Sequence, residues 1–129
     1  MWMYFKKQPS RDLVFPYTAL SPTLRKKIVQ YNIEELWNEV DRIIAEDPES
    51  KFTQGANLYH NLVHCADSSY FCDYETSIAV EEFMAVKRFN IPLYKSLDEA
   101  DYERLVVFSA IDEEYNALIK EEQDGQIHN

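Results

Sequence analysis

Glycine and cysteine are both scarce in this chain of 129 residues, which contains two of each. The shortage of glycine argues against glycine-rich phosphate loops, nucleophile elbows and the tight turns of an all-β fold. Cys65 and Cys72 alone do not make a disulfide framework, so we expect reduced thiols and a cytoplasmic location. No apolar run approaches the roughly 20 residues that span a bilayer, and the N-terminal MWMYFKK lacks the apolar stretch of a secretory signal. We therefore expect no membrane partner.

Basic residues are few: 13 lysines and arginines stand against 23 acidic residues, for a net charge of −10. The charge is uneven, since residues 1–30 carry +5 and residues 31–129 carry −15. We expect no direct binding to nucleic acid, because that mode depends on basic side chains that release counterions from phosphates. An acidic chain is suited instead to docking on a basic protein surface. The alternative is that the acids simply keep a small helical protein in solution.

The length and composition predict one globular domain. Hydrophobic residues make up 46% and aromatic residues 14% of the chain, enough to build a core without metal or disulfides. We expect an all-α fold, a single compact domain of four to five helices with an aromatic, extended N-terminal arm. The predicted boundaries are residues 1–20 for the arm, 21–122 for the helical domain and 123–129 for a flexible tail.

The first half of the chain contains one strong helical pattern. The arm has no helical periodicity and can include a short strand. Ser21-Pro22 has the form of a helix start, which predicts helix in the basic segment that runs through Gln30. Asn32 is a cap candidate for an amphipathic helix that ends at Glu46-Asp47-Pro48, and residues 47–55 are typical of a loop.

Two further helices are predicted in the second half. Asp73 is placed to cap a helix that runs to about Phe89, with Lys87 and Arg88 in its favourable last turn. The sequence Ser96-Leu97-Asp98-Glu99 has the form of a capping box and predicts the start of the last helix there. We expect that helix to fray after Glu122.

Residues 59–67, YHNLVHCAD, are the segment that could carry chemistry. If they are helical, His64 lies about 40° from His60 around the axis and Asp67 about 20° from it on the other side, which would suit iron, zinc or manganese. The Tyr-His-Asn-x-x-His core resembles the metal-site signature of cyclic-nucleotide phosphodiesterases and related HD phosphohydrolases. That resemblance implies that His64 binds metal and that His60 donates a proton to the leaving oxygen. The chain has no His-Asp dipeptide, however, so it cannot assemble the complete site of those enzymes.

We favour a different interpretation for the two histidines, in which both pack in the core and bind no metal. We therefore expect no cofactor. If the metal site does exist, we expect zinc or iron in it. Cys65 follows His64 directly, but adjacent helical residues point about 100° apart, which favours an inert buried thiol. The paired glutamates along the helices are typical of a solvated face rather than of catalytic carboxylates.

The last helix carries acidic residues densely enough to imitate a line of phosphates. Aromatic residues at the N-terminus add side chains of the type that anchor interfaces. The predicted contact residues for a protein partner are Asp98, Glu99, Asp101, Glu103, Asp112, Glu113, Glu114, Trp2 and Tyr4.

Residues 71–123 combine an acidic helix that ends in Lys-Arg-Phe, a proline-containing linker and LDEADY at the start of a long helix. In this the chain resembles small bacteriophage accessory proteins, such as tail-assembly chaperones. The resemblance implies a non-enzymatic protein that binds another protein, either as an assembly factor or as an inhibitor of a host protein in the host cytoplasm, with a homodimer as a possible state. The alternative function is a metal-binding domain or metal-dependent phosphohydrolase that uses His60, His64 and Asp67.

Overall fold

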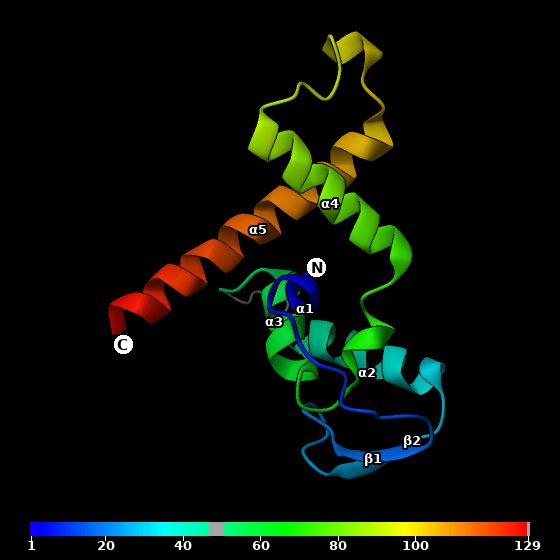
Figure 1. Ribbon diagram of the computed structural model, residues 1–129. Coiled ribbons are helices and arrows are strands. Elements are labelled where there is room, and N and C mark those ends of the chain that lie inside the picture. Colours follow the sequence, from blue (N-terminus) through cyan, green and yellow to red (C-terminus); the bar gives the residue numbers. More distant parts are fainter. Residues whose placement is uncertain (47–50, 129) are drawn as a thin grey trace. The chain divides into compact units, whose positions relative to one another are not determined.

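The computed structural model describes residues 1–46 and 51–128 and shows a mostly helical protein with one small β-hairpin (Figure 1). The elements are α1 (Trp2–Phe5), β1 (Tyr17–Leu20), β2 (Lys27–Gln30), α2 (Ile33–Glu46), α3 (Gln54–Leu62), η1 (Ser68–Tyr70), α4 (Tyr74–Phe89), η2 (Leu97–Glu99) and α5 (Tyr102–His128). The predicted helical class is confirmed. Internal packing divides the chain into two compact units, which we call the N-terminal unit (residues 2–72) and the C-terminal unit (from residue 73).

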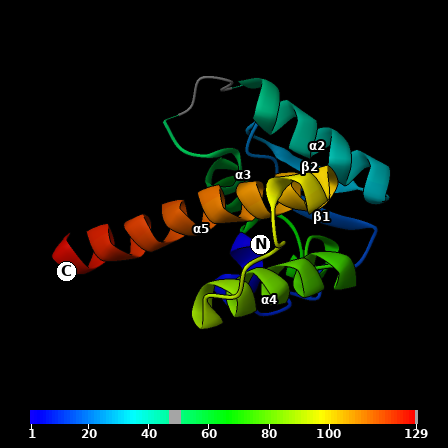
Figure 2. The same ribbon diagram turned by 90° about the horizontal axis from the view of Figure 1, so that it is seen from above.

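The N-terminal unit packs α2, α3 and the hairpin around one apolar core. Strands β1 and β2 are antiparallel, with Tyr17 opposite Gln30 and Leu20 opposite Lys27, and the hairpin lies against α2 (Figure 2). The buried side chains of this core are Met3, Leu36, Val40, Ile43, Leu62, Cys65 and Ala66. Three members of the predicted stripe of α2 thus face the interior, whereas Trp37 is 44% exposed.

The prediction of a helix from Ser21 to Gln30 is wrong, because this segment forms the turn of the hairpin and strand β2. The Ser21 amide donates to the Lys26 carbonyl, and Arg25 adopts a left-handed conformation with a φ of 58°. Burial alternates along β2, as expected for a half-buried strand. Ser21-Pro22 satisfied the rule for a helix start, but the chain uses both residues in a turn.

The C-terminal unit is built on α4 and α5, which cross one another (Figure 1). The rings of Phe83, Phe108 and Tyr115 meet edge to face at this crossing, with centroids 5.9–6.1 Å from Phe83. The predicted bounds of α4 are confirmed: Asp73 accepts the Thr76 amide at 2.7 Å, and Asn90 ends the helix in a left-handed conformation.

The start of α5 differs from the prediction. Leu97–Glu99 forms a separate 3₁₀ turn, and α5 begins at Tyr102, where Asp101 accepts the Glu103 amide at 3.1 Å. The helix is described as far as His128. Within the predicted loop, residues 47–50 lie outside the described part of the chain.

Candidate functional site

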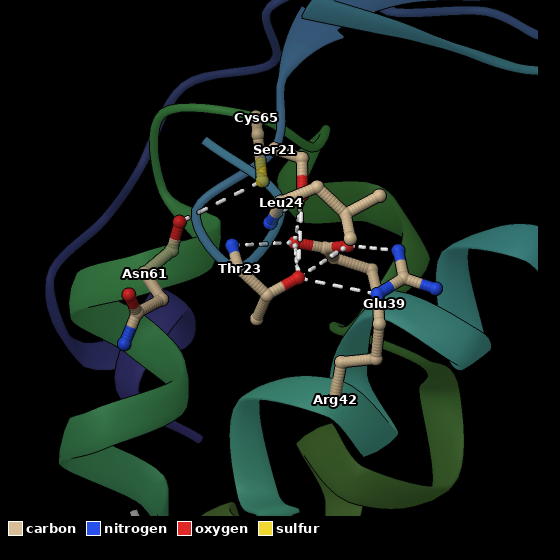
Figure 3. Close-up of polar contacts among 7 residues, drawn as sticks. All are labelled: Ser21, Thr23, Leu24, Glu39, Arg42, Asn61 and Cys65. Atoms are coloured by element: carbon tan, nitrogen blue, oxygen red, sulfur yellow. Dashed lines mark hydrogen bonds and ion pairs between the residues drawn. The ribbon is translucent and has the colours of Figure 1, made fainter. Parts of the chain in front are cut away.

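A buried carboxylate joins the hairpin turn to α2 (Figure 3). Glu39 is fully buried, and its carboxylate accepts hydrogen bonds from the Ser21 hydroxyl at 2.8 Å, from the Thr23 amide at 3.3 Å and from the guanidinium of Arg42. Arg42 Nε in turn donates to the Thr23 hydroxyl at 3.1 Å. Every oxygen of the buried charge therefore has a partner, which burial in an apolar interior requires.

Burial by itself would raise the pKa of Glu39. The hydrogen bonds from Ser21, Arg42 and Thr23 outweigh it, and the pKa lies below its ordinary value. Glu39 is ionised at neutral pH and holds the turn in place. The sequence contains a signal for this cluster, because Glu39 falls on the apolar stripe of α2 between Leu36 and Ile43.

A second buried carboxylate, Asp67, holds the N-terminal segment. It accepts hydrogen bonds from the Ser69 amide at 2.9 Å, the Ser10 hydroxyl at 2.8 Å and the Arg11 amide at 3.0 Å. The Ser69 amide is the largest of the causes that hold the pKa of Asp67 well below its usual range; burial opposes them. Because its carboxylate closes a loop of more than 50 residues, Asp67 acts as a structural anchor.

The metal triad was conditional on one continuous helix over residues 59–67, and the structure has no such helix. Helix α3 ends at Leu62, so His64 lies beyond it, and Asp67 caps the next turn in an extended conformation. His60 lies on α3 with its ring 6.0 Å from that of Trp2. Among the side chains that the structure describes, no three of His, Cys, Asp or Glu come close enough together to hold a metal ion.

Cys65 is a buried thiol, and burial raises its pKa to about 11. Burial also raises the pKa of neighbouring Tyr17 to about 12, and the Tyr17 hydroxyl donates to the Cys65 carbonyl at 3.0 Å. A thiol with so high a pKa is protonated at neutral pH and is a poor nucleophile. Cys65 therefore belongs to the core.

The two N-terminal aromatic residues differ in accessibility. Trp2 is only 4% exposed, and its ring lies 5.7 Å from that of Tyr59. Tyr4 is half-buried, with its ring edge-on to Phe5. Trp2 therefore serves the packing of the N-terminal unit, and only Tyr4 keeps an accessible surface.

Almost all of the net charge lies in the C-terminal unit. Residues 73–129 contain 14 acidic and 5 basic residues, net −9, whereas residues 1–72 contain 9 acidic and 8 basic residues, net −1. The predicted contact residues Asp98, Glu99, Asp101, Glu103, Asp112 and Glu113 are exposed, and Glu114 is half-buried. The boundary between the two packing units is thus also a boundary in charge.

The acidic residues of α5 do not form a single line. Glu103 and Glu114 are 11 residues apart, about three turns, and share one side of the helix. Asp112 lies on the other flank, with a carboxylate oxygen 4.0 Å from the ammonium of Lys87 on α4. Glu113 lies opposite buried Ile111. Negative charge consequently surrounds the exposed part of α5.

An open groove lies between α4 and α5, lined by Phe83, Val86, Lys87, Leu105, Phe108, Ser109 and Asp112. Most of its lining is apolar, and the lining also includes Lys87 and Asp112, which form an ion pair. Exposed apolar side chains also occur at the start of α5, where Tyr102, Val106 and Val107 are each more than 40% exposed. Apolar and acidic groups thus occur side by side on this unit.

The protein is thus mostly helical, and its helices α4 and α5 belong to a strongly acidic unit. A search with protein-family models, curated proteins and solved structures finds no match to this chain. Within the described residues, no helix is both long enough and apolar enough to cross a membrane. The functional argument therefore rests on the surfaces of the chain itself.

Proposed function

We propose that this chain is a non-enzymatic accessory protein whose acidic C-terminal unit binds a protein with a basic surface. The supporting observation is the concentration of nine of the ten net negative charges in residues 73–129. A field of one sign over one unit attracts a partner of opposite charge, raises the rate of encounter and disfavours other partners.

Two versions of this function are compatible with the resemblance to small phage proteins. An inhibitor that occupies a basic groove of a host protein depends mainly on charge, so its binding weakens strongly with salt. An assembly chaperone holds apolar patches of its client, so its binding persists at high salt. The exposed acids on η2 and α5 favour the first version.

The test neutralises exposed acids of the C-terminal unit that have no part in a cap. The variant carries Asp98→Asn, Glu103→Gln and Glu113→Gln. The control carries Asp12→Asn, Glu34→Gln and Asp41→Asn, which change the net charge equally within the N-terminal unit. Both variants and the wild type are used to capture proteins from an extract of the source cell, at about 50 mM and about 300 mM salt.

We expect a basic protein that is captured by wild type and by the control at low salt, and lost with the variant. We also expect about tenfold weaker binding by the variant when that protein is purified, equivalent to about 1.4 kcal/mol. Equal capture by variant and control would contradict the proposal.

A further inference from the structure

The hairpin has an exposed apolar surface with lysines at its turn end, beside Arg25, which pairs with Glu46 of α2 at 3.7 Å. In the register of the sheet, Thr18 pairs with Val29 and Leu20 with Lys27, and these pairs point away from the core. Leu20 is 60% exposed and Val29 is 40% exposed. Residues 13–33 contain no acidic residue and include Arg25, Lys26 and Lys27 at the turn. We call the set Leu20, Leu24, Lys26, Lys27 and Val29 the hairpin surface.

Helix α4 has a second apolar face besides the one that packs on α5. Val80 and Phe83 are buried, whereas Tyr74 is 79% exposed and Phe89 is 65% exposed. Tyr74, Ile78, Ala85 and Phe89 follow one another at spacings of 4, 7 and 4 residues, which places them on one side of the helix. We call these four residues the outer face of α4.

Acidic side chains flank this outer face. Glu75 and Glu82 follow it on one side, and Glu81 lies on the other. Glu82 forms an ion pair with Arg104, with 3.2 Å between a carboxylate oxygen and a guanidinium nitrogen. The guanidinium of Arg88 lies 5.4 Å from the centre of the Phe89 ring. The surrounding unit has a net charge of −9, so the outer face of α4 is an apolar strip in a negative field.

We propose that the hairpin surface of one copy of this protein binds the outer face of α4 on a second copy. Each surface exposes large apolar side chains, and their burial in a contact lowers the free energy of the complex. The charges around the two surfaces are opposite, so close approach brings attraction in place of repulsion. The complementary surfaces belong to one polypeptide and are therefore always present in equal amounts. This inference is independent of the proposed function.

Such contact is heterologous, because different surfaces of the two copies meet. A heterologous contact leaves one free surface of each kind on every dimer and continues into rings or open chains.

The first experiment measures the weight-average mass of the whole protein by sedimentation over a range of concentrations. We expect the mass to rise with concentration at about 50 mM salt and to fall towards that of the monomer at about 500 mM salt. A monomer at every concentration and both salt levels overturns the proposal. A monomer whose radius of gyration changes with salt indicates pairing within one chain, and it also overturns the proposal.

The second experiment uses two variants, each with one damaged surface. The hairpin variant carries Lys26→Glu and Lys27→Glu, and the α4 variant carries Tyr74→Ser and Phe89→Ser. We expect each variant alone to be monomeric, with self-association at least about tenfold weaker than in the wild type. Mixing them leaves one intact hairpin surface and one intact outer face, so the mixture should form a 1:1 dimer and nothing larger.

A matched control carries Lys7→Glu and Lys51→Glu, which change the charge of the N-terminal unit by the same amount outside the hairpin. We expect it to associate like the wild type. Far-ultraviolet circular dichroism establishes that each variant is folded. If folded variants remain monomeric when mixed, or if the control is as monomeric as the hairpin variant, the assignment of the two surfaces is wrong.

Discussion

Two buried carboxylates each connect segments that are distant in the sequence. Glu39 binds residues 21–23 of the hairpin turn, and Asp67 binds residues 10–11 of the N-terminal segment. Further hydrogen bonds hold the same segment, from Gln8 to the Tyr59 hydroxyl at 2.6 Å and from Tyr70 to the Leu13 carbonyl at 2.8 Å. The predicted arm is thus fastened to the body by polar side chains as well as by its aromatic residues.

Asp67→Ala should destabilise the N-terminal unit by about 2–4 kcal/mol, because several hydrogen bonds to one buried charge are lost together. Urea unfolding followed by tryptophan fluorescence measures this loss, and limited proteolysis should cut the chain faster near residues 8–12. Asp12→Asn neutralises an exposed carboxylate of the same segment, keeps a residue type that tolerates the left-handed backbone of position 12, and should have a much smaller effect. Equal effects of the two changes would show that Asp67 is not the anchor.

Because the pKa values of Glu39 and Asp67 are low in the folded state, we predict that the protein loses stability in acid. Their pKa values are lower in the folded state than the ordinary values of about 4 that an unfolded chain retains. Their contribution is therefore complete above about pH 5 and declines as the pH falls through 4 towards the folded pKa values. Glu39→Gln should lower stability at pH 7 and flatten its dependence on pH between about 5 and 3. Urea unfolding at pH 7, 5 and 3 tests this, with the exposed Glu34→Gln as a control for the loss of one acidic side chain from α2.

At the scale of the element, local sequence decided where α4 begins and ends. Asp73 caps its first turn, and Asn90 ends it with φ 52° and ψ 44°. The amide of Ile91 then bonds to the Val86 carbonyl at 3.1 Å, which satisfies a carbonyl of the last turn. The hairpin shows the opposite case. Ser21-Pro22 is a local signal for a helix start, but contacts with α2 stabilise a turn and a strand over residues 21–30 instead.

Replacing Asn90 tests the left-handed end of α4. Asn90→Gly should leave stability within a few tenths of a kcal/mol, since glycine adopts this conformation freely. Asn90→Val should cost about 1–2 kcal/mol, because a β-branched side chain clashes there. Thermal unfolding followed by circular dichroism compares the two at one position, and equal stabilities would contradict the assigned cap.

At the scale of the whole molecule, the chain divides after Cys72 into a nearly neutral unit and a strongly acidic one. Both tryptophans, Trp2 and Trp37, belong to the N-terminal unit. Tryptophan fluorescence therefore reports on that unit, whereas circular dichroism reports on the helices of both.

This division predicts that a core change in one unit leaves the other unit in place. Phe83→Ala removes a ring from the crossing of α4 and α5 and should destabilise the C-terminal unit by about 3–5 kcal/mol. Circular dichroism should then show an early transition, while the fluorescence transition stays near that of the wild type. Ile43→Ala, in the core of the N-terminal unit, should shift the fluorescence transition instead. A single coincident transition in both variants would show that the units unfold together.

The candidate site could be predicted only in part. The exposed acids Asp98, Glu99 and Glu113 follow from composition, because charged side chains are rarely buried without partners. Helical spacing would bring His60, His64 and Asp67 onto one face only if the helix continued through residue 67, and α3 ends at Leu62. Glu39 and Asp67 were missed as anchors because the segments they hold are distant in sequence: Ser21 and Thr23 lie 18 and 16 residues from Glu39, and Ser10 lies 57 residues from Asp67.

The sequence by itself determined the helical class, the bounds of α4, the cap of α2 by Asn32 and the uneven charge, since each depends on residues within one turn or on simple counting. Only the tertiary structure decided that residues 17–30 form a hairpin, that Trp2 is buried and that the charge divides at a packing boundary. The physical reason is that these features depend on distant contacts. Burial of Glu39 with its partners stabilises the hairpin over residues 21–30, although the local sequence there also favours a helix.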